Sequence, residues 1–179
     1  MKGLVFTEFI EFVEGKFGFE ISDQMITASE LKSGGVYTAV GTYEFKEMQS
    51  LLMNLHKETK IPLPILLETY GSHLFYKFVE MFPQFVDKSK SLFHFISGID
   101  QYIHVEVKKL YPDAELPKII VDNSTDEYLK LTYISERKLG YFALGLLKSA
   151  IKCFQEKIEI EMEFKKEDGS EVQFTLKKV

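Results

Sequence analysis

Apolar residues recur at every third or fourth position through most of the first two thirds of the chain, which is the spacing of helices with one buried face. Residues 4–17 show this pattern most clearly, with Glu8, Glu11 and Glu14 between the apolar positions. Glycine or proline follows most of these segments and would end each helix. The sequence therefore predicts helices over residues 4–17, 22–35 (with Ser22 as its cap), 42–60, 65–83, 86–98 and 99–112.

The pattern changes in the last third of the chain, where apolar and polar residues alternate as they do in half-buried strands. Residues 118–136 predict two strands joined by a turn at 123–126, and residues 158–179 predict a hairpin around "KEDGS". Residues 141–157 return to the helical spacing. The expected fold class is α+β, an N-terminal helical part followed by a C-terminal antiparallel sheet with an inserted helix. No repeat or linker interrupts the chain, so residues 1–179 are expected to form a single domain.

Composition narrows the classes of partner. The chain is 45% apolar and holds 16 Phe and 9 Tyr with no Trp, a set that can fill a core or enclose a flat apolar ligand. The net charge of −5 argues against nucleic acid, because binding a phosphate backbone needs a basic face. The single cysteine, Cys153, rules out an internal disulfide and a cluster of several cysteines around a metal.

Nothing in the sequence points to a membrane or to export. No uninterrupted apolar stretch approaches the roughly 18 residues that a spanning helix needs. The acidic side chains of residues 4–17 would be excluded from the apolar core of a secretory leader. We therefore expect a soluble, cytoplasmic protein.

A candidate anion site lies in "YISERKLGYF", residues 133–142. Tyr133, Ser135 and Arg137 fall at every second position, so a strand through this segment would place them on one face. Each side chain can donate hydrogen bonds, and the planar guanidinium suits a carboxylate or a phosphate. The pattern predicts a clamp for an anionic group.

Of the four histidines, His104 stands out by its surroundings, between Ile103 and Val105 in a predicted helix. No two histidines stand four residues apart, so the usual spacing of a zinc site is missing. A neutral imidazole presented by a rigid helix to an apolar pocket suits a five-coordinate haem iron. Its other ring nitrogen is expected to donate to the backbone carbonyl of Asp100. The Tyr133/Ser135/Arg137 clamp would then hold the two haem propionates.

Two other classes of function stay open at this point. A haem enzyme would need an acid–base pair on the open side of the ring, and His73 is the one nearby candidate. A haem-free module for a lipid or another apolar carboxylate could use Arg137 in the same way, but it would leave His104 unexplained.

Four segments together resemble the haem nitric oxide/oxygen binding (H-NOX) family, bacterial relatives of the haem domain of soluble guanylate cyclase. They are "MKGLVFTEFIEFVEGKFG", "ETYGSHLFYKF", "HVEVKKLYPDAELP" and "YISERKLGYF", in the family's order and across essentially the whole chain. The resemblance implies haem b (iron protoporphyrin IX) buried between the helical part and the sheet, in a sensor that is not an enzyme.

The resemblance also implies roles for particular residues. His104 matches the proximal iron ligand, and Tyr133, Ser135 and Arg137 match the propionate clamp. Pro117 matches a proline that presses on the haem edge. The remaining matches are apolar side chains that line the pocket, namely Val5, Phe78 and Leu146.

The same resemblance bears on which gas is bound. Oxygen-binding members carry a distal tyrosine five residues beyond the clamp arginine, and here that position is Phe142. Phe9 likewise replaces a polar distal partner. Tyr141 is one residue away, a rotation of about 100° on a helix, although a slip in register would bring it inward. The expected ligands are nitric oxide and carbon monoxide, with oxygen excluded; the alternative is an oxygen-binding sensor of the same family.

Signalling is expected to run through the bond between iron and His104, which nitric oxide would weaken or break. Stand-alone members of the family act on a separate partner, usually a sensor histidine kinase or a cyclic-di-GMP enzyme. Some relatives carry a zinc-bound cysteine cluster near the C-terminus, which a chain with Cys153 alone cannot build.

Overall fold

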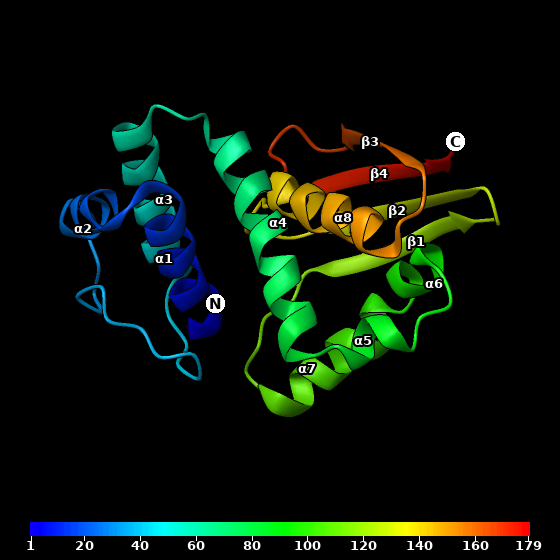
Figure 1. Cartoon of the computed structure of the whole chain (residues 1–179), viewed down its shortest axis with the longest axis horizontal. Coiled ribbons are helices and arrows are strands. Elements are labelled where there is room, and N and C mark those ends of the chain that lie inside the picture. Colours follow the sequence, from blue (N-terminus) through cyan, green and yellow to red (C-terminus); the bar gives the residue numbers. More distant parts are fainter. The chain divides into compact units, whose positions relative to one another are not determined.

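All residues from Met1 to Val179 are described in the computed structural model of the chain, which divides into two compact units, Met1–Tyr70 and Gly71–Val179 (Figure 1). Helix α4 (Leu63–Met81) begins in the first unit and ends in the second. The expectation of a single haem-binding domain over residues 1–179 stays a prediction.

The first unit is helical, as the apolar spacing predicts. It contains α1 (Gly3–Phe17), α2 (Phe19–Thr27), α3 (Phe45–Thr59) and the start of α4. Its core is rich in aromatic rings, and the buried Tyr70 hydroxyl donates a hydrogen bond of 2.5 Å to the carbonyl oxygen of Val5.

The helix predicted over residues 22–35 is wrong in both of its bounds, because α2 spans Phe19–Thr27. Ser22 lies buried within the helix and is not its cap. The chain beyond Thr27 is held in turns by tertiary bonds, since the buried Glu47 carboxylate accepts the hydroxyls of Ser33 (2.5 Å) and Tyr37 (2.8 Å). These bonds outweigh the local preference for helix.

The second unit combines helices with a four-stranded antiparallel sheet in the order β1-β2-β4-β3. Its strands are β1 (Lys118–Ser124), β2 (Tyr128–Ile134), β3 (Ile158–Phe164) and β4 (Glu171–Lys178). Its helices beyond α4 are α5 (Gln84–Asp87), α6 (Leu92–Ser97), the π-helix η1 (Ile99–Ile103), α7 (His104–Leu110) and α8 (Gly140–Phe154). These elements confirm the α+β class.

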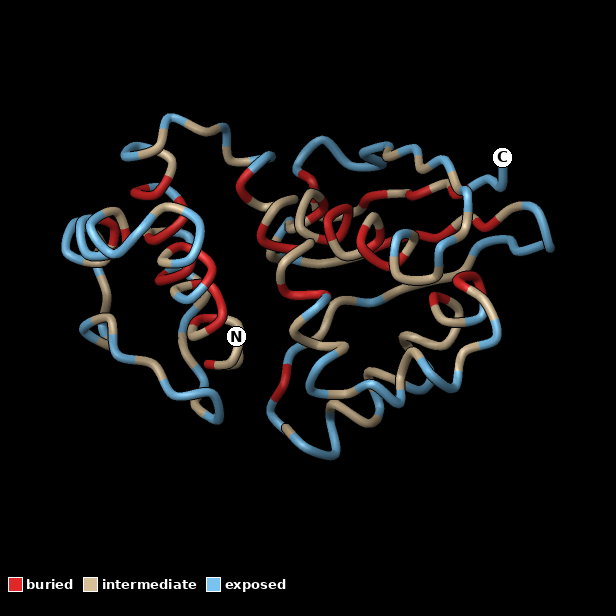
Figure 2. The backbone as a smooth tube through the Cα atoms, viewed as in Figure 1, coloured by how far each residue is buried: buried red, intermediate tan, exposed pale blue.

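One face of the sheet forms the core of the second unit, and α8 packs on it (Figure 2). Leu129, Leu131 and Tyr133 alternate along β2 with their side chains buried. The partner residues on β4 are buried too, which pins the register, because a slip of one residue would turn this apolar set toward water.

The helix predicted over residues 99–112 is divided in two. The N–H groups of Ile103 and His104 bond to carbonyls five residues back, those of Gly98 and Ile99. This wider winding defines the π-helix η1, and the α-helical winding resumes at His104. Single π-turns of this kind are frequent at functional sites.

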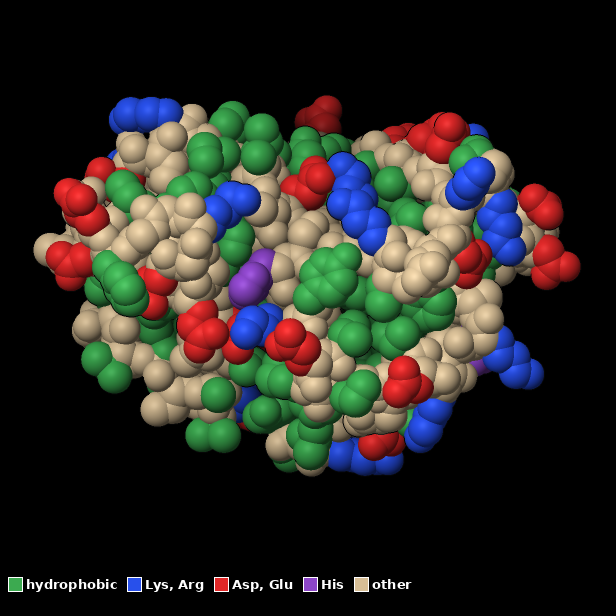
Figure 3. All heavy atoms as spheres, in the orientation of Figure 1, with side chains coloured by type: hydrophobic (Ala, Val, Ile, Leu, Met, Phe, Trp, Pro, Cys, Tyr) green, Lys and Arg blue, Asp and Glu red, His purple; other side chains and the backbone are tan.

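None of the helices combines the length and the apolar character needed to cross a membrane. On the face shown in Figure 3, basic side chains are interspersed with acidic ones and are not gathered into one patch. This face therefore offers no continuous positive surface for a phosphate backbone.

Helices α4 and α8 approach each other closely at Gly71. A Cβ atom on Gly71 would lie 2.2 Å from the carbonyl oxygen of Phe142 and 3.3 Å from the backbone nitrogen of Leu146. Both neighbours are backbone atoms, so neither can rotate away. A larger residue at this position would therefore force the backbones of the two helices to shift apart.

We expect Gly71→Ala to destabilise the protein by about 1–3 kcal/mol, because α8 must shift to admit the methyl group. The melting temperature should fall by roughly 2–4 °C for each kcal/mol. The matched control is Gly15→Ala in α1, where nothing lies within 4 Å of the added Cβ. That control should gain about 0.5–1 kcal/mol from helix propensity. Equal melting temperatures for Gly71→Ala and the unaltered protein would contradict the close crossing.

Candidate functional site

The predicted clamp residues come together, but not in the way that their alternation predicts. Strand β2 ends at Ile134, so Tyr133 lies on the strand and Ser135 and Arg137 lie in the turn that follows. After the Ser135 N–H bonds to the carbonyl of Ser170, the chain turns back, and the Lys138 N–H bonds to the carbonyl of Ser135. The prediction that the three side chains share one face of a strand is therefore wrong. The turn after β2 brings Ser135 and Arg137 close to Tyr133.

A short network of polar groups fixes this turn. The Ser135 hydroxyl accepts the backbone N–H of Arg137 at 3.2 Å, a local bond typical of serine in turns. Burial raises the pKa of the Tyr133 phenol, and its hydrogen bond with Ser135 and the nearby charge of Arg137 oppose this in part. Tyr133 is therefore a neutral phenol at neutral pH.

The guanidinium of Arg137 is largely enclosed, with 16% of its side chain exposed. One of its nitrogens donates to the backbone oxygen of Glu115 at 2.8 Å, and another pairs with the Glu115 carboxylate. Glu115 precedes Pro117 by two residues and is exposed. The fork already meets a carboxylate here, so its orientation suits the chemical group that a haem propionate would bring.

Glu115 was not among the residues that the sequence predicted. It stands 22 residues before Arg137 in the chain. Neither its spacing nor its surroundings carries a local signal for this contact, which depends on how the segment before β1 folds back toward the turn after β2.

His104 opens α7 directly after the π-helix η1. Its side chain is 16% exposed, and its Nδ1 lies 3.0 Å from a carboxylate oxygen of Asp100. The prediction that the His104 ring bonds to the backbone carbonyl of Asp100 is therefore wrong, because its partner is the Asp100 carboxylate. Carbonyl groups in this stretch point along the helix axis, whereas the carboxylate reaches the ring from one turn back.

The state of His104 suits a metal ligand. Burial lowers its pKa, while the hydrogen bond and the charge of Asp100 oppose that shift, and the net direction is downward. The ring is therefore neutral at neutral pH. With the Nδ1 proton donated to Asp100, the lone pair of Nε2 is available to iron.

The apolar candidates of the second unit are all half-buried and belong to three elements of structure. Phe78 lies on α4, and Pro117 lies just before β1. Phe142 and Leu146 lie one turn apart on α8, beside its close contact with Gly71. Partly exposed apolar side chains are what a pocket for a flat apolar ring needs.

Val5 and Phe9 lie on α1 in the first unit, and they differ in burial. Val5 is half-buried, whereas Phe9 is fully buried, with its ring edge-on to Tyr70 at 5.0 Å between centroids. Phe9 therefore already has a place in the core of this unit. Its place on a distal wall stays a prediction.

Tyr141 packs toward the sheet. Its ring lies 5.7 Å from that of Phe164 in β3, between centroids. A Cβ on the preceding Gly140 would lie 2.8 Å from Val172 of β4, so this side of α8 is pressed against the sheet. The next residue, Phe142, carries the carbonyl that meets Gly71 of α4. Tyr141 thus contacts the sheet, and the adjacent Phe142 contacts α4 through its backbone. A slip in register that would turn Tyr141 away from the sheet is not observed.

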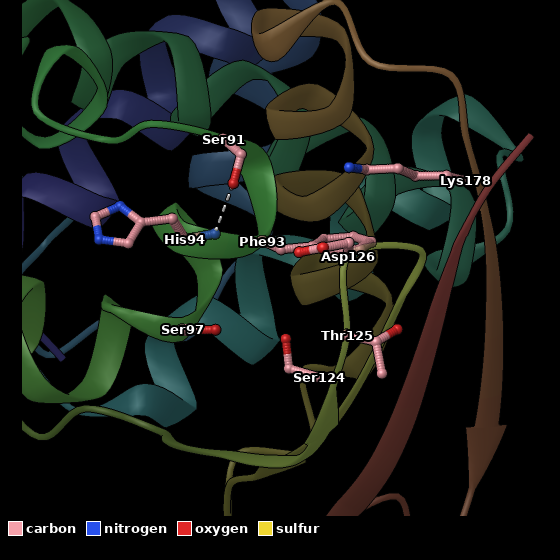
Figure 4. A pocket seen from close by; sticks show the side chains of 8 residues that line it. All are labelled: Ser91, Phe93, His94, Ser97, Ser124, Thr125, Asp126 and Lys178. Carbon is pink, nitrogen blue, oxygen red and sulfur yellow. Dashed lines mark hydrogen bonds between the residues drawn. The ribbon is translucent and has the colours of Figure 1, made fainter.

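Two further features lie apart from these groups. His73 is half-buried on α4. A cavity of about 310 Å³ is bordered by α6, the β1–β2 turn and the end of β4, and none of the predicted site residues lines it. In Figure 4 the His94 imidazole and the Lys178 ammonium lie on opposite sides of this cavity, and they do not converge on one point.

No group of three or more His, Cys, Asp or Glu side chains converges in the way that a metal ion held by protein alone would need. His104, with one ring nitrogen engaged and the other available, instead fits a metal whose remaining ligands come from a porphyrin. With an anion clamp and half-buried apolar side chains, these features describe a haem-binding sensor domain.

Comparison with known proteins identifies the family. The sequence model described as Haem-NO-binding matches residues 2–162. The chain therefore belongs to the Haem-NO-binding, or H-NOX, family, whose domains bind haem and sense gases. The resemblance seen in the sequence is confirmed.

Solved structures of this family share the fold along the whole chain. The unliganded Fe(II) H-NOX protein of K. algicida is 44% identical, with 100% of this chain and 97% of that chain covered and a TM-score of 0.96. The Fe(II)CO H-NOX of Shewanella woodyi, bound to IWP-051, is 37% identical, with 100% and 95% covered and a TM-score of 0.84. The Fe(II)NO H-NOX protein of S. oneidensis is 26% identical, with 100% and 99% covered and a TM-score of 0.90. Comparison with curated proteins finds no match.

We expect Arg137→Ala to weaken haem retention, because the propionate charge would lose its partner. A hydrogen bond to a charged group contributes about 1.5–3 kcal/mol, which corresponds to roughly 10–100-fold in affinity. The measurement is the rate of haem transfer to an excess of haem-free globin. Lys152→Ala, which removes an exposed cation near the end of α8, is the control and should transfer haem at the unaltered rate. Equal rates for both variants would remove Arg137 from the clamp.

Proposed function

We propose that this protein is a nitric oxide sensor that uses ferrous haem b and excludes oxygen. The observation that supports the choice of gas is the packing of Tyr141 on Phe164 in β3. By the family resemblance, the position of the distal tyrosine falls on Phe142, which is apolar.

Bound ferrous haem would supply an iron at which a diatomic gas can bind. His104 would hold this iron through Nε2, since Asp100 engages Nδ1. Tyr133, Ser135 and Arg137 would hold the propionates. In that state Glu115 would share the guanidinium with a propionate or leave it, because both carboxylates need the same donors.

Oxygen and nitric oxide make different demands on the residues around them. Oxygen takes on negative charge when it binds ferrous iron, so it needs a hydrogen-bond donor within reach. The absence of such a bond costs about 1.5–3 kcal/mol. Phe142 has no donor to offer, and nitric oxide needs none. Half-buried apolar side chains at Phe78 and Leu146 would complete such a wall, and Pro117 would press on the ring edge.

The signal would pass through His104 because it is the first residue of α7. Binding of nitric oxide would weaken the hold of His104 on iron, and the helix that carries the imidazole would then be free to move. The equilibrium moves only as far as the difference in affinity of the gas for the two states allows. The output would be a changed surface that a cytoplasmic partner reads, either a sensor histidine kinase or a cyclic-di-GMP enzyme. The protein itself would not act as an enzyme.

The visible spectrum of the anaerobically reduced holoprotein tests this function. Nitric oxide, added without air, should shift the spectrum of the five-coordinate ferrous form. Air alone should produce no stable new ferrous spectrum, because no donor stabilises oxygen. Carbon monoxide should bind in either case and does not discriminate.

Tyr141→Phe is the matched variant, since it removes the phenol next to Phe142 in the sequence and leaves the ring that packs on Phe164. It should behave as the unaltered protein does with both gases. A stable spectrum in air for the unaltered protein, lost in Tyr141→Phe, would contradict the proposal and indicate an oxygen-binding sensor.

A further inference from the structure

Asp100 and His104 form a pair within one turn of the chain. The Asp100 carboxylate lies 3.0 Å from Nδ1 of His104, and the two side chains are 39% and 16% exposed. The bond is therefore only partly shielded from water on the carboxylate side, while the imidazole is well enclosed. The distance between the two atoms is the usual one for a hydrogen bond between nitrogen and oxygen.

The pair spans the end of the π-helix and the start of α7. Asp100 lies within the π-helix η1, and His104 is the first residue after it. The backbone N–H of His104 bonds to the carbonyl of Ile99, five residues back, as the π-winding requires. The orientation of the imidazole is thus set by the side chain of Asp100. The backbone N–H of His104 is already bonded within the helix.

A carboxylate does more to an imidazole than a backbone carbonyl would. It carries a full negative charge, and charge-assisted hydrogen bonds are roughly twice as strong as neutral ones. By drawing on the Nδ1 proton, it increases the electron density at Nε2. Carboxylate–histidine–metal groupings of this kind fix the ring and raise the basicity of the ligand.

We propose that Asp100 is a positioning residue that strengthens the bond from His104 to iron and thereby sets how readily nitric oxide releases this histidine. The inference rests on the proposed function, in which His104 is the ligand. A strong bond makes His104 slower to leave after the gas binds. Asp100 would therefore set the threshold of the sensor without touching the gas or the iron.

Resonance Raman spectroscopy of the reduced holoprotein tests this through the iron–histidine stretching mode. In Asp100→Asn the amide oxygen can still accept the Nδ1 proton, but without the charge, so the mode should move to lower wavenumber. Release of His104 after nitric oxide binds, followed by rapid-mixing absorption, should become about tenfold faster. Asp100→Glu keeps the charge and should restore at least part of both values.

Glu106→Gln is the matched control. It removes one carboxylate from α7, where Glu106 pairs with Lys109 at 2.6 Å and not with the imidazole. Its stretching mode and release rate should equal those of the unaltered protein.

The outcomes separate this inference from the function on which it rests. Suppose that the unaltered protein shows the iron–histidine mode, and that Asp100→Asn changes neither this mode nor the release rate. That result would overturn the role of Asp100 alone. The absence of that mode in the unaltered reduced protein would overturn His104 as the ligand, and the role of Asp100 with it. An equal shift in Asp100→Asn and Asp100→Glu would also overturn the inference, because it would reflect altered packing and not the lost charge.

Discussion

The proposed haem site depends on a single hydrogen bond, from Nδ1 of His104 to the Asp100 carboxylate. It fixes the tautomer, so one nitrogen is committed and the other is available. Burial keeps the ring neutral against the pull of the neighbouring carboxylate. The π-turn η1 ends directly before this histidine, and such turns are frequent at functional sites.

In the proposed sensor, helix α8 would decide which side chain stands near the gas, and its rotation is fixed from two sides. Gly140 lets it press on the sheet, and Gly71 lets α4 press on it at Phe142. A helix held by backbone contact on one side and packed side chains on the other cannot turn by the ~100° that separates adjacent residues. Tyr141 therefore stays against Phe164. The account of oxygen exclusion depends on that fixed rotation.

The sequence predicts the parts of this fold that follow from periodic burial, such as α1, α3, α8 and the sheet, because each has an apolar face at regular spacing. It does not predict the end of β2 at Ile134, since the turn there depends on a backbone bond from Ser135 to Ser170, far along the chain. The clamp residues were predicted from their types and their spacing on one strand face, whereas Ser135 and Arg137 lie in the turn that follows β2; their role as a clamp stays a prediction. Glu115 left no local signal because its contact with Arg137 is purely tertiary.

The most direct test of the account is His104→Gly, expressed and purified with and without imidazole, with His94→Gly as the control on an exposed histidine. The account predicts that His104→Gly holds haem in a five-coordinate ferrous form only when imidazole fills the vacated space. The control should hold haem without it. An unchanged five-coordinate spectrum for His104→Gly without imidazole would show that another residue ligates the iron, and it would contradict the central role of His104.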